Sequence, residues 1–220
     1  MTKLLLIGAA VLLLVPQDSP FNGKDLSGWK CKGAEAKSKW KVGKAVWEKE
    51  TPAKLTITEG DELVNTDGKG VDLYSEAKWG DAVIEVDVLV PKGSNSGVYV
   101  MGEYEVQVLD SFGKEKVGAG DMGGLYGASA PKVNASKAPG EWQKFVIDYR
   151  APKFDEKGAK TANLKFVKVE LNGQVIHENV EMKGPTPSGV TGKEAATGPI
   201  MFQGDHGPVA YRNIKVSPIK

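Results

Sequence analysis

The sequence predicts an all-β protein, a sandwich or jelly roll built from antiparallel sheets. Three observations support this fold class. Apolar and polar residues alternate with a period of two in many short segments, as in strands with one buried face. The 27 glycines and 12 prolines suit a fold with many turns. No segment after the apolar N-terminal run shows a sustained helical period.

The expected strands follow one another toward the C-terminus. They cover residues 82–90, 98–101, 104–109, 145–150, 167–171, 174–177 and 209–216. Asn172 and Gly173 separate two of them, and this pair accepts the positive φ angles of a tight hairpin turn. In the last strand, the alternation places Arg212 on the same face as Ile214 and Val216. A guanidinium on an apolar face requires a partner carboxylate, because an unpaired buried charge is costly.

The N-terminus has the features of a secretory signal peptide. Lys3 is followed by an uninterrupted apolar run over residues 4–15, which is too short for a transmembrane helix. We therefore expect a signal peptide over residues 1–18, export to the periplasm, cell surface or medium, and one folded domain over residues 19–220. No lipobox cysteine follows the run, so a stable membrane anchor is not expected.

Charge and cysteine content argue against nucleic-acid binding and exclude two kinds of cysteine-based structure. The net charge is +1, which provides no general attraction to nucleic acids. Cys31 is the single cysteine, so an internal disulfide framework and a cysteine-rich zinc site are both excluded.

Residues 103–109 carry the most informative polar pattern. Tyr104, Val106 and Val108 alternate with Glu103, Glu105 and Gln107. If the apolar set faces the core, the polar set lines the opposite face. On a curved sheet this face can hold a sugar, with carboxylates serving as acid or base. The alternative interpretation is an ordinary solvated face.

Three other features are candidates for function, each with a structural alternative. His206 follows Asp205 in a glycine-bearing segment, so it is either a proton carrier or a structural loop histidine. Asn95 either contacts a ligand or makes a local turn bond. Long connections over residues 111–140, 151–163 and 181–198 are of the length that often carries function.

Several segments together resemble the 3-keto-disaccharide hydrolase domain family. They are FNGKDLSGW at residues 21–29, NSGVY at 95–99, YEVQVLD at 104–110, GLYG at 124–127, PGEW at 139–142, LNG at 171–173, GPI at 198–200 and RNI at 212–214. The resemblance implies a concanavalin A-like jelly roll and action on glycosides oxidised at carbon 3. Many members have an arginine before the YEVQ strand, where this chain has Met101.

The polar positions that match the family define the expected site. They are Asn95, Glu105, Gln107, Asp110, Tyr126, Asp205, His206 and Arg212. A ketone at carbon 3 acidifies the hydrogen on carbon 2, so Glu105 or His206 is expected to remove that proton. Elimination of the carbon 1 substituent and addition of water then complete hydrolysis. The other six positions are expected to bind the carbohydrate and the enolate oxygen.

Two further functions remain open, together with the cofactor. The chain is alternatively a non-catalytic carbohydrate-binding module, or an ordinary glycoside hydrolase using Glu103 and Glu105. A divalent metal could stabilise the enolate, and no organic cofactor is expected. The sequence does not indicate an oligomeric state.

Overall fold

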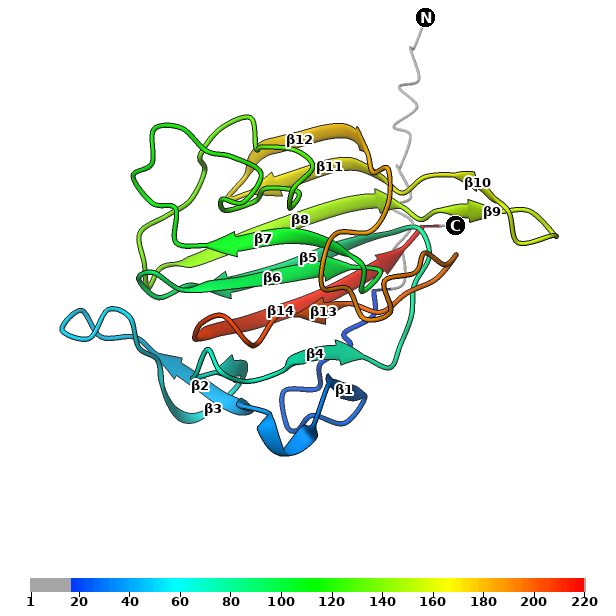
Figure 1. The fold of residues 1–220 in the computed structure, drawn as a ribbon. Helices are drawn as coiled ribbons and strands as arrows, with labels where there is room; N and C mark the ends of the chain where they lie inside the picture. Colours follow the sequence, from blue (N-terminus) through cyan, green and yellow to red (C-terminus); the bar gives the residue numbers. More distant parts are fainter. Residues whose placement is uncertain (1–16, 220) are drawn as a thin grey trace, which may run out of the picture.

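The computed structural model describes residues 17–219 and consists mainly of two large antiparallel sheets (Figure 1). The expected signal peptide therefore lies outside the described residues, apart from Gln17 and Asp18. Among the described residues, no helix is long and apolar enough to cross a bilayer.

The smaller sheet has five strands in the order β1-β4-β13-β6-β7. They are β1 (Trp29–Lys32), β4 (Asp72–Ser75), β13 (Met201–Phe202), β6 (Asn95–Val100) and β7 (Tyr104–Leu109). The larger sheet has seven strands in the order β12-β11-β8-β5-β14-β3-β2. They are β12 (Gln174–Glu181), β11 (Lys165–Leu171), β8 (Trp142–Arg150), β5 (Ala82–Leu89), β14 (Val209–Pro218), β3 (Thr56–Asn65) and β2 (Trp40–Val46).

The remaining elements are short. Strands β9 (Lys153–Phe154) and β10 (Lys160–Ala162) form a two-stranded ribbon, and a single 3₁₀ turn, η1, spans Glu35–Lys37. The predicted jelly-roll sandwich of two antiparallel sheets is therefore confirmed.

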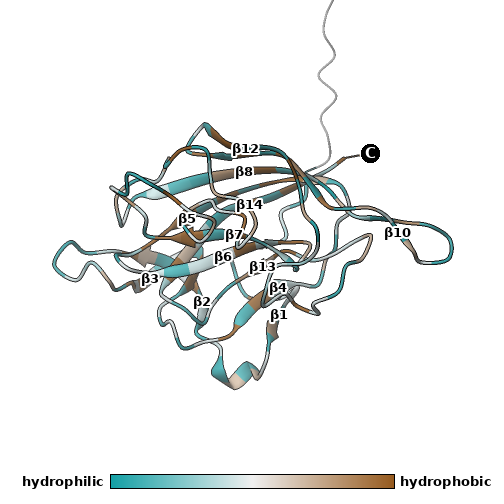
Figure 2. Ribbon diagram, turned by 45° about the horizontal axis from the view of Figure 1, so that its top comes forward, coloured by the Kyte–Doolittle hydropathy of each residue, from teal (hydrophilic) through white to brown (hydrophobic). Residues whose placement is uncertain are grey.

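The core lies between the two sheets and is built from the alternating apolar positions. Ile84, Val86 and Val88 of β5 have no exposed surface, and neither do Val106 and Val108 of β7. Each fully buried aliphatic side chain contributes about 1.5–3 kcal/mol relative to exposure. Figure 2 shows apolar residues along strands such as β5 and β8, whereas the peripheral loops are largely hydrophilic. The alternation predicted for these strands is confirmed.

The β11–β12 hairpin turns at Asn172 and Gly173, as predicted. Their φ angles are 54° and 79°, which a glycine and an asparagine tolerate better than other residues. The Asn172 side chain also accepts a hydrogen bond from Lys144 N (2.9 Å) and donates one to Ala135 O (2.8 Å).

A β-bulge in β14 overturns the orientation predicted for Arg212. Asn213 has a φ of 53°, and the pairing with β5 shifts register between Arg212 and Lys215. One extra residue reverses the alternation, so Tyr211, Ile214 and Val216 are buried on one face. The prediction that Arg212 shares this apolar face is wrong.

Arg212 instead lies on the outer side of the seven-stranded sheet. Its guanidinium stacks 3.9 Å from the ring centroid of Trp142. Arg212 also pairs with Glu62 (3.3 Å) and Asp87 (3.5 Å). The expected carboxylate partners therefore exist, and they belong to β3 and β5.

Two loops occupy the free edge of β7. Tyr126 N donates to Glu105 O (3.1 Å), and Gln107 exchanges main-chain bonds with Gly123 and Gly124 (both 2.8 Å). Thr186 N donates to Glu103 O (2.9 Å). Figure 1 shows the connection from β12 to β13, in orange, crossing β6 and β7. An exposed edge is thus covered, and both loops are held beside Glu105.

Candidate functional site

A cavity of about 110 Å³ lies on the face of the five-stranded sheet that is turned away from the core. It is lined by Asn95, Tyr99, Glu105, Gln107, Tyr126, Pro187, Ser188, Gln203 and His206. Five of the eight site residues expected from the sequence are therefore brought together here. We call this cavity the β7 pocket.

Strand pairing explains the floor of the β7 pocket. Opposite Glu105 on β6 lies Tyr99, and opposite Gln107 lies Gly97. A Cβ at Gly97 would lie 2.3 Å from Glu105 Oε1, so the carboxylate occupies the space that this glycine leaves empty. Glu105 and Gln107 are each only 3% exposed and form the bottom of the pocket.

Glu105 is the group best suited to exchange a proton near neutral pH. Burial raises its pKa to about 7, although a hydrogen bond from Tyr99 and the nearby His206 oppose the rise. The Tyr99 hydroxyl donates to Oε2 (3.0 Å). A base is most effective when its pKa lies near the working pH. The geometry therefore combines a poised carboxylate with access to a cavity.

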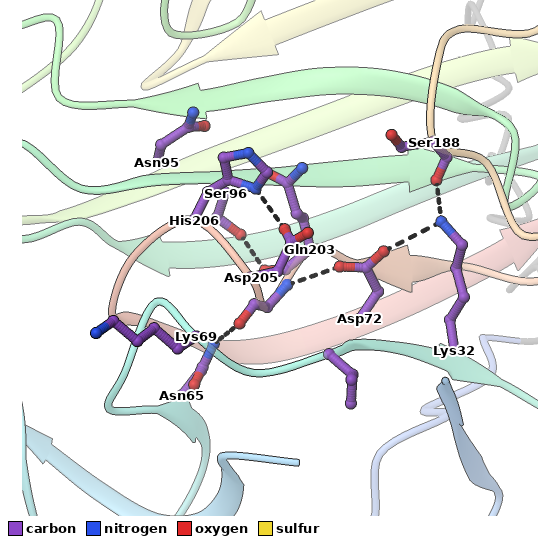
Figure 3. Close-up of polar contacts among 12 residues, drawn as sticks. Lys32, Asn65, Lys69, Asp72, Asn95, Ser96, Ser188, Gln203, Asp205 and His206 are labelled. Carbon is purple, nitrogen blue, oxygen red and sulfur yellow. Dashed lines mark hydrogen bonds and ion pairs between the residues drawn. The ribbon is translucent and has the colours of Figure 1, made fainter. Parts of the chain in front are cut away.

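His206 lies at the pocket on the loop that follows β13, and Figure 3 shows it near Gln203. Its Nδ1 contacts the carboxylate of Asp205. The root of this loop is fixed, because Gly204 N donates to Asp72 Oδ1 (3.0 Å) and Asn65 Nδ2 donates to Gly204 O (2.8 Å). Asp205 itself does not line the pocket; it contacts the imidazole that does.

Two amide oxygens in the pocket have no hydrogen-bond donor within the described part of the chain. They are Oε1 of Gln107 and Oε1 of Gln203, both buried. An unsatisfied buried acceptor costs about 1–3 kcal/mol. Gln107 Nε2 meanwhile donates to Asn95 Oδ1 (3.1 Å), so the Asn95 amide group keeps its own N–H donors for a ligand. The pocket thus offers acceptors and donors suited to a polyhydroxylated molecule.

The remaining expected residues lie elsewhere. Asp110 does not line the pocket, and its Oδ2 accepts a bond from Gly93 N (3.0 Å). Arg212 is on the other sheet, as described above. Glu103 lies in the turn before β7, where Thr191 N, Thr191 Oγ1 and Gly192 N donate to its carboxylate (2.7, 2.7 and 2.9 Å). Glu103 does not line the β7 pocket, and its carboxylate is engaged by these three hydrogen bonds.

The family model described as the 3-keto-alpha-glucoside-1,2-lyase-like domain matches residues 17–217. The chain belongs to this family. Three solved structures from Parabacteroides distasonis, each provisionally assigned as a glycosyl hydrolase, are similar to this family member. The first has 28% identity and a TM-score of 0.72, with 92% of this chain and 84% of the other covered.

The second P. distasonis structure has 18% identity and a TM-score of 0.63, covering 93% and 94% of the two chains. The third has 20% identity and a TM-score of 0.52, covering 87% and 99%. These two likenesses concern the fold alone. No curated protein sequence matches the chain.

Sequence reasoning missed four residues of the pocket in this 3-keto-glucoside lyase-like domain. Two of them could have been found from the sequence. Tyr99 lies an even number of residues after Asn95 on β6, so both side chains point to the same face of the sheet, and Gln203 directly follows the buried strand β13. Pro187 and Ser188 had no signal beyond the length of their loop. Ser188 is held at the pocket by Lys32, whose Nζ donates to its carbonyl oxygen (2.5 Å) and pairs with Asp72 (3.4 Å).

A protein-bound metal ion usually needs several side-chain ligands that converge on one point. Among residues 17–219, no three His, Cys, Asp or Glu side chains converge in a way that could hold a metal ion. No step of the reaction proposed below is routed through a metal.

Proposed function

We propose that this family member is an exported enzyme that cleaves 3-keto-glycosides, with Glu105 as the base. The observation that carries the proposal is a carboxyl group with a pKa of about 7 at the floor of a pocket whose amide oxygens lack donors. Sugar hydroxyls would satisfy those oxygens. Family membership and the glycosyl hydrolase assignment of the similar structure support a carbohydrate substrate.

The first step is proton abstraction. The Glu105 carboxylate takes the hydrogen from carbon 2, and the electron pair of that bond forms the enolate of the carbon 3 ketone. The amide N–H groups of Asn95, left free by the bond from Gln107, donate to the enolate oxygen. Hydrogen-bond donors placed where negative charge develops in the transition state lower the activation barrier by several kcal/mol.

The second step expels the substituent on carbon 1. The enolate re-forms the ketone, a double bond forms between carbons 1 and 2, and the carbon 1–oxygen bond breaks. His206, acting as the general acid, gives a proton to the leaving oxygen. Water then adds to carbon 1, its proton returns to His206, and Glu105 returns its proton to carbon 2. The sum is hydrolysis with both residues restored.

An ordinary glycoside hydrolase mechanism is less well supported. It needs two carboxylates about 5–9.5 Å apart at the scissile bond. The neighbouring candidate, Glu103, is engaged by three hydrogen bonds from Thr191 and Gly192. Glu105 is the only Asp or Glu among the residues that line the β7 pocket.

Matched substrates test the proposal. A methyl 3-keto-glucoside and the parent methyl glucoside are offered to the purified protein, with and without chelator, in deuterated water. Cleavage of the keto sugar alone, with deuterium at carbon 2 of recovered substrate or product, supports the mechanism. Cleavage of the parent sugar favours an ordinary glycosidase, and saturable binding without turnover favours a binding module. Loss of activity with chelator would bring a metal back into the reaction.

Export is a separate proposal. Asp18 exchanges two main-chain hydrogen bonds with Val216 (2.7 and 2.8 Å) and accepts one from Trp79 Nε1 (2.9 Å). Removing Asp18 with a leader would break all three bonds, so the cleavage point that we propose lies before Asp18 instead of after it, where the sequence alone placed it. Mass analysis of protein recovered from the medium or periplasm tests both points; an uncleaved cytoplasmic chain would refute export.

A further inference from the structure

A second hollow, of about 520 Å³, lies beside the β7 pocket. We propose that it binds the leaving group and selects glycosides with an aromatic aglycone; this proposal rests on the proposed function. The hollow is lined by residues 126–128 and 180–187. We call it the aglycone groove.

The two cavities adjoin each other. Tyr126 and Pro187 line both of them. Two other hollows, of about 420 and 250 Å³, share no lining residue with the β7 pocket. A group that leaves a sugar held over Glu105 therefore has the aglycone groove as its adjoining space.

The small volume of the β7 pocket means that a whole glycoside needs a second space. Pockets that hold small molecules usually measure about 300–1,000 Å³. At about 110 Å³, the β7 pocket has room for the reacting part of one sugar ring. The rest of a glycoside needs further space, and the adjoining groove, which shares Tyr126 and Pro187 with the pocket, supplies it in this proposal.

The chemistry of the lining favours a planar apolar group. The Tyr126 side chain is 39% exposed, which is unusual for a large aromatic residue in this chain. Ala128, Val180, Met182, Pro185 and Pro187 complete an apolar lining, while the charged residues Glu181 and Lys183 are exposed. Aromatic rings stack on such faces with a gain beyond area burial.

The groove is also fixed in position relative to the base. Tyr126 N donates to Glu105 O, and Glu105 N donates to Thr186 Oγ1 (3.1 and 2.9 Å). Both walls are therefore bonded to the main chain of the residue that removes the proton. A preorganised wall lets binding of the aglycone improve the rate without an ordering cost.

The test compares benzyl and methyl 3-keto-glucosides of the same anomeric form, because their two leaving alcohols differ little in acidity. We expect kcat/KM for the benzyl compound to be about tenfold higher or more, as burial of one ring predicts. Tyr126→Ala should bring the ratio of the two values close to one. Ala128→Glu, which places a carboxylate in the groove, should lower the same ratio.

Phe112→Ala is the matched control, because Phe112 is an exposed aromatic residue that lines none of these hollows. It should leave the ratio unchanged. A ratio near one in the unmodified protein, a ratio insensitive to Tyr126→Ala, or a stronger preference for a 3-keto-disaccharide would overturn the aromatic assignment.

Failure of the proposed function is distinguishable from failure of this inference. If neither compound is cleaved, the enzymatic proposal fails, and the groove is then measured by calorimetry with the same two compounds. About tenfold tighter binding of the benzyl compound, lost in Tyr126→Ala, would still support the groove. Equal affinities would refute it.

Discussion

Replacing Glu105 by glutamine should abolish activity and, at alkaline pH, make the protein more stable. The amide keeps the shape of the carboxyl group and can still accept the hydrogen bond from Tyr99. It cannot take a proton from carbon 2, so kcat should fall by about two to four orders of magnitude. The gain in stability follows from the buried position of Glu105.

The expected gain can be worked out from the pKa. Burial raises the pKa of Glu105 from 4.5 to about 7. Below about pH 4.5 the folded and unfolded chains both hold the proton, so burial of the carboxyl has no pH-dependent cost. As the pH rises from 4.5 to 7, the unfolded chain releases the proton more readily, and stability falls by about 3 kcal/mol. Glutamine removes this loss.

Urea unfolding followed by tryptophan fluorescence at pH 4.5, 6 and 8 measures the effect. Glu105→Gln should match the unmodified protein at pH 4.5 and exceed it by up to about 3 kcal/mol at pH 8. This corresponds to about 6–12 °C in Tm for a domain of this size. Glu103→Gln is the control: it weakens the bonds from Thr191 and Gly192 and should destabilise at all three pH values.

Two results would refute this reasoning. Equal stability of Glu105→Gln and the unmodified protein at pH 8 would mean that the carboxyl group is not held at an unfavourable, buried position. Near-normal turnover of a 3-keto-glucoside by Glu105→Gln would remove Glu105 from the chemistry, whatever its pKa.

Three further predictions concern neighbouring residues. Tyr99→Phe removes a bond that lowers the pKa of Glu105, so the acid limb of the kcat/KM profile should move to higher pH; an unmoved limb contradicts the assignment. Gly97→Ala places a methyl group where the Glu105 carboxylate lies, and kcat should drop about a hundredfold while the fold persists by circular dichroism. Arg212→Ala should reduce stability by about 1–3 kcal/mol, measured by urea unfolding, yet change kcat/KM less than twofold; a large loss of activity would return Arg212 to the site.

Much of the fold could be predicted because burial on one face imposes a visible period. The alternation in β5 and β8 and the Asn172–Gly173 turn are local patterns, and the structure follows them. The floor of the site could be predicted for the same reason, because Glu105 and Gln107 alternate along β7 with apolar residues that face the core.

What could not be predicted depends on single residues and on main-chain contacts. One bulged residue, Asn213, reverses which residues of β14 face the core. An asparagine at that position does not by itself distinguish a bulge from a regular strand. The turn at Met101 and Gly102, with φ angles of 57° and 70°, leads into Glu103, whose carboxylate is bonded by Thr191 and Gly192 of a sequence-distant loop. The loop walls dock through main-chain groups, which leave no pattern of side chains to detect.

Because two loops dock on the free edge of β7, the strand that carries Glu105 and the loops that form the walls of the pocket are different segments of the chain. Because peptide groups make most of these attachments, the residues that face the substrate can be exchanged without detaching the wall that bears them. A change at position 126 or 187 would then alter which glycoside is accepted while the proton chemistry at Glu105 continues. Grafting residues 182–188 from a related chain is thus a direct route to a different preference on the same sheet.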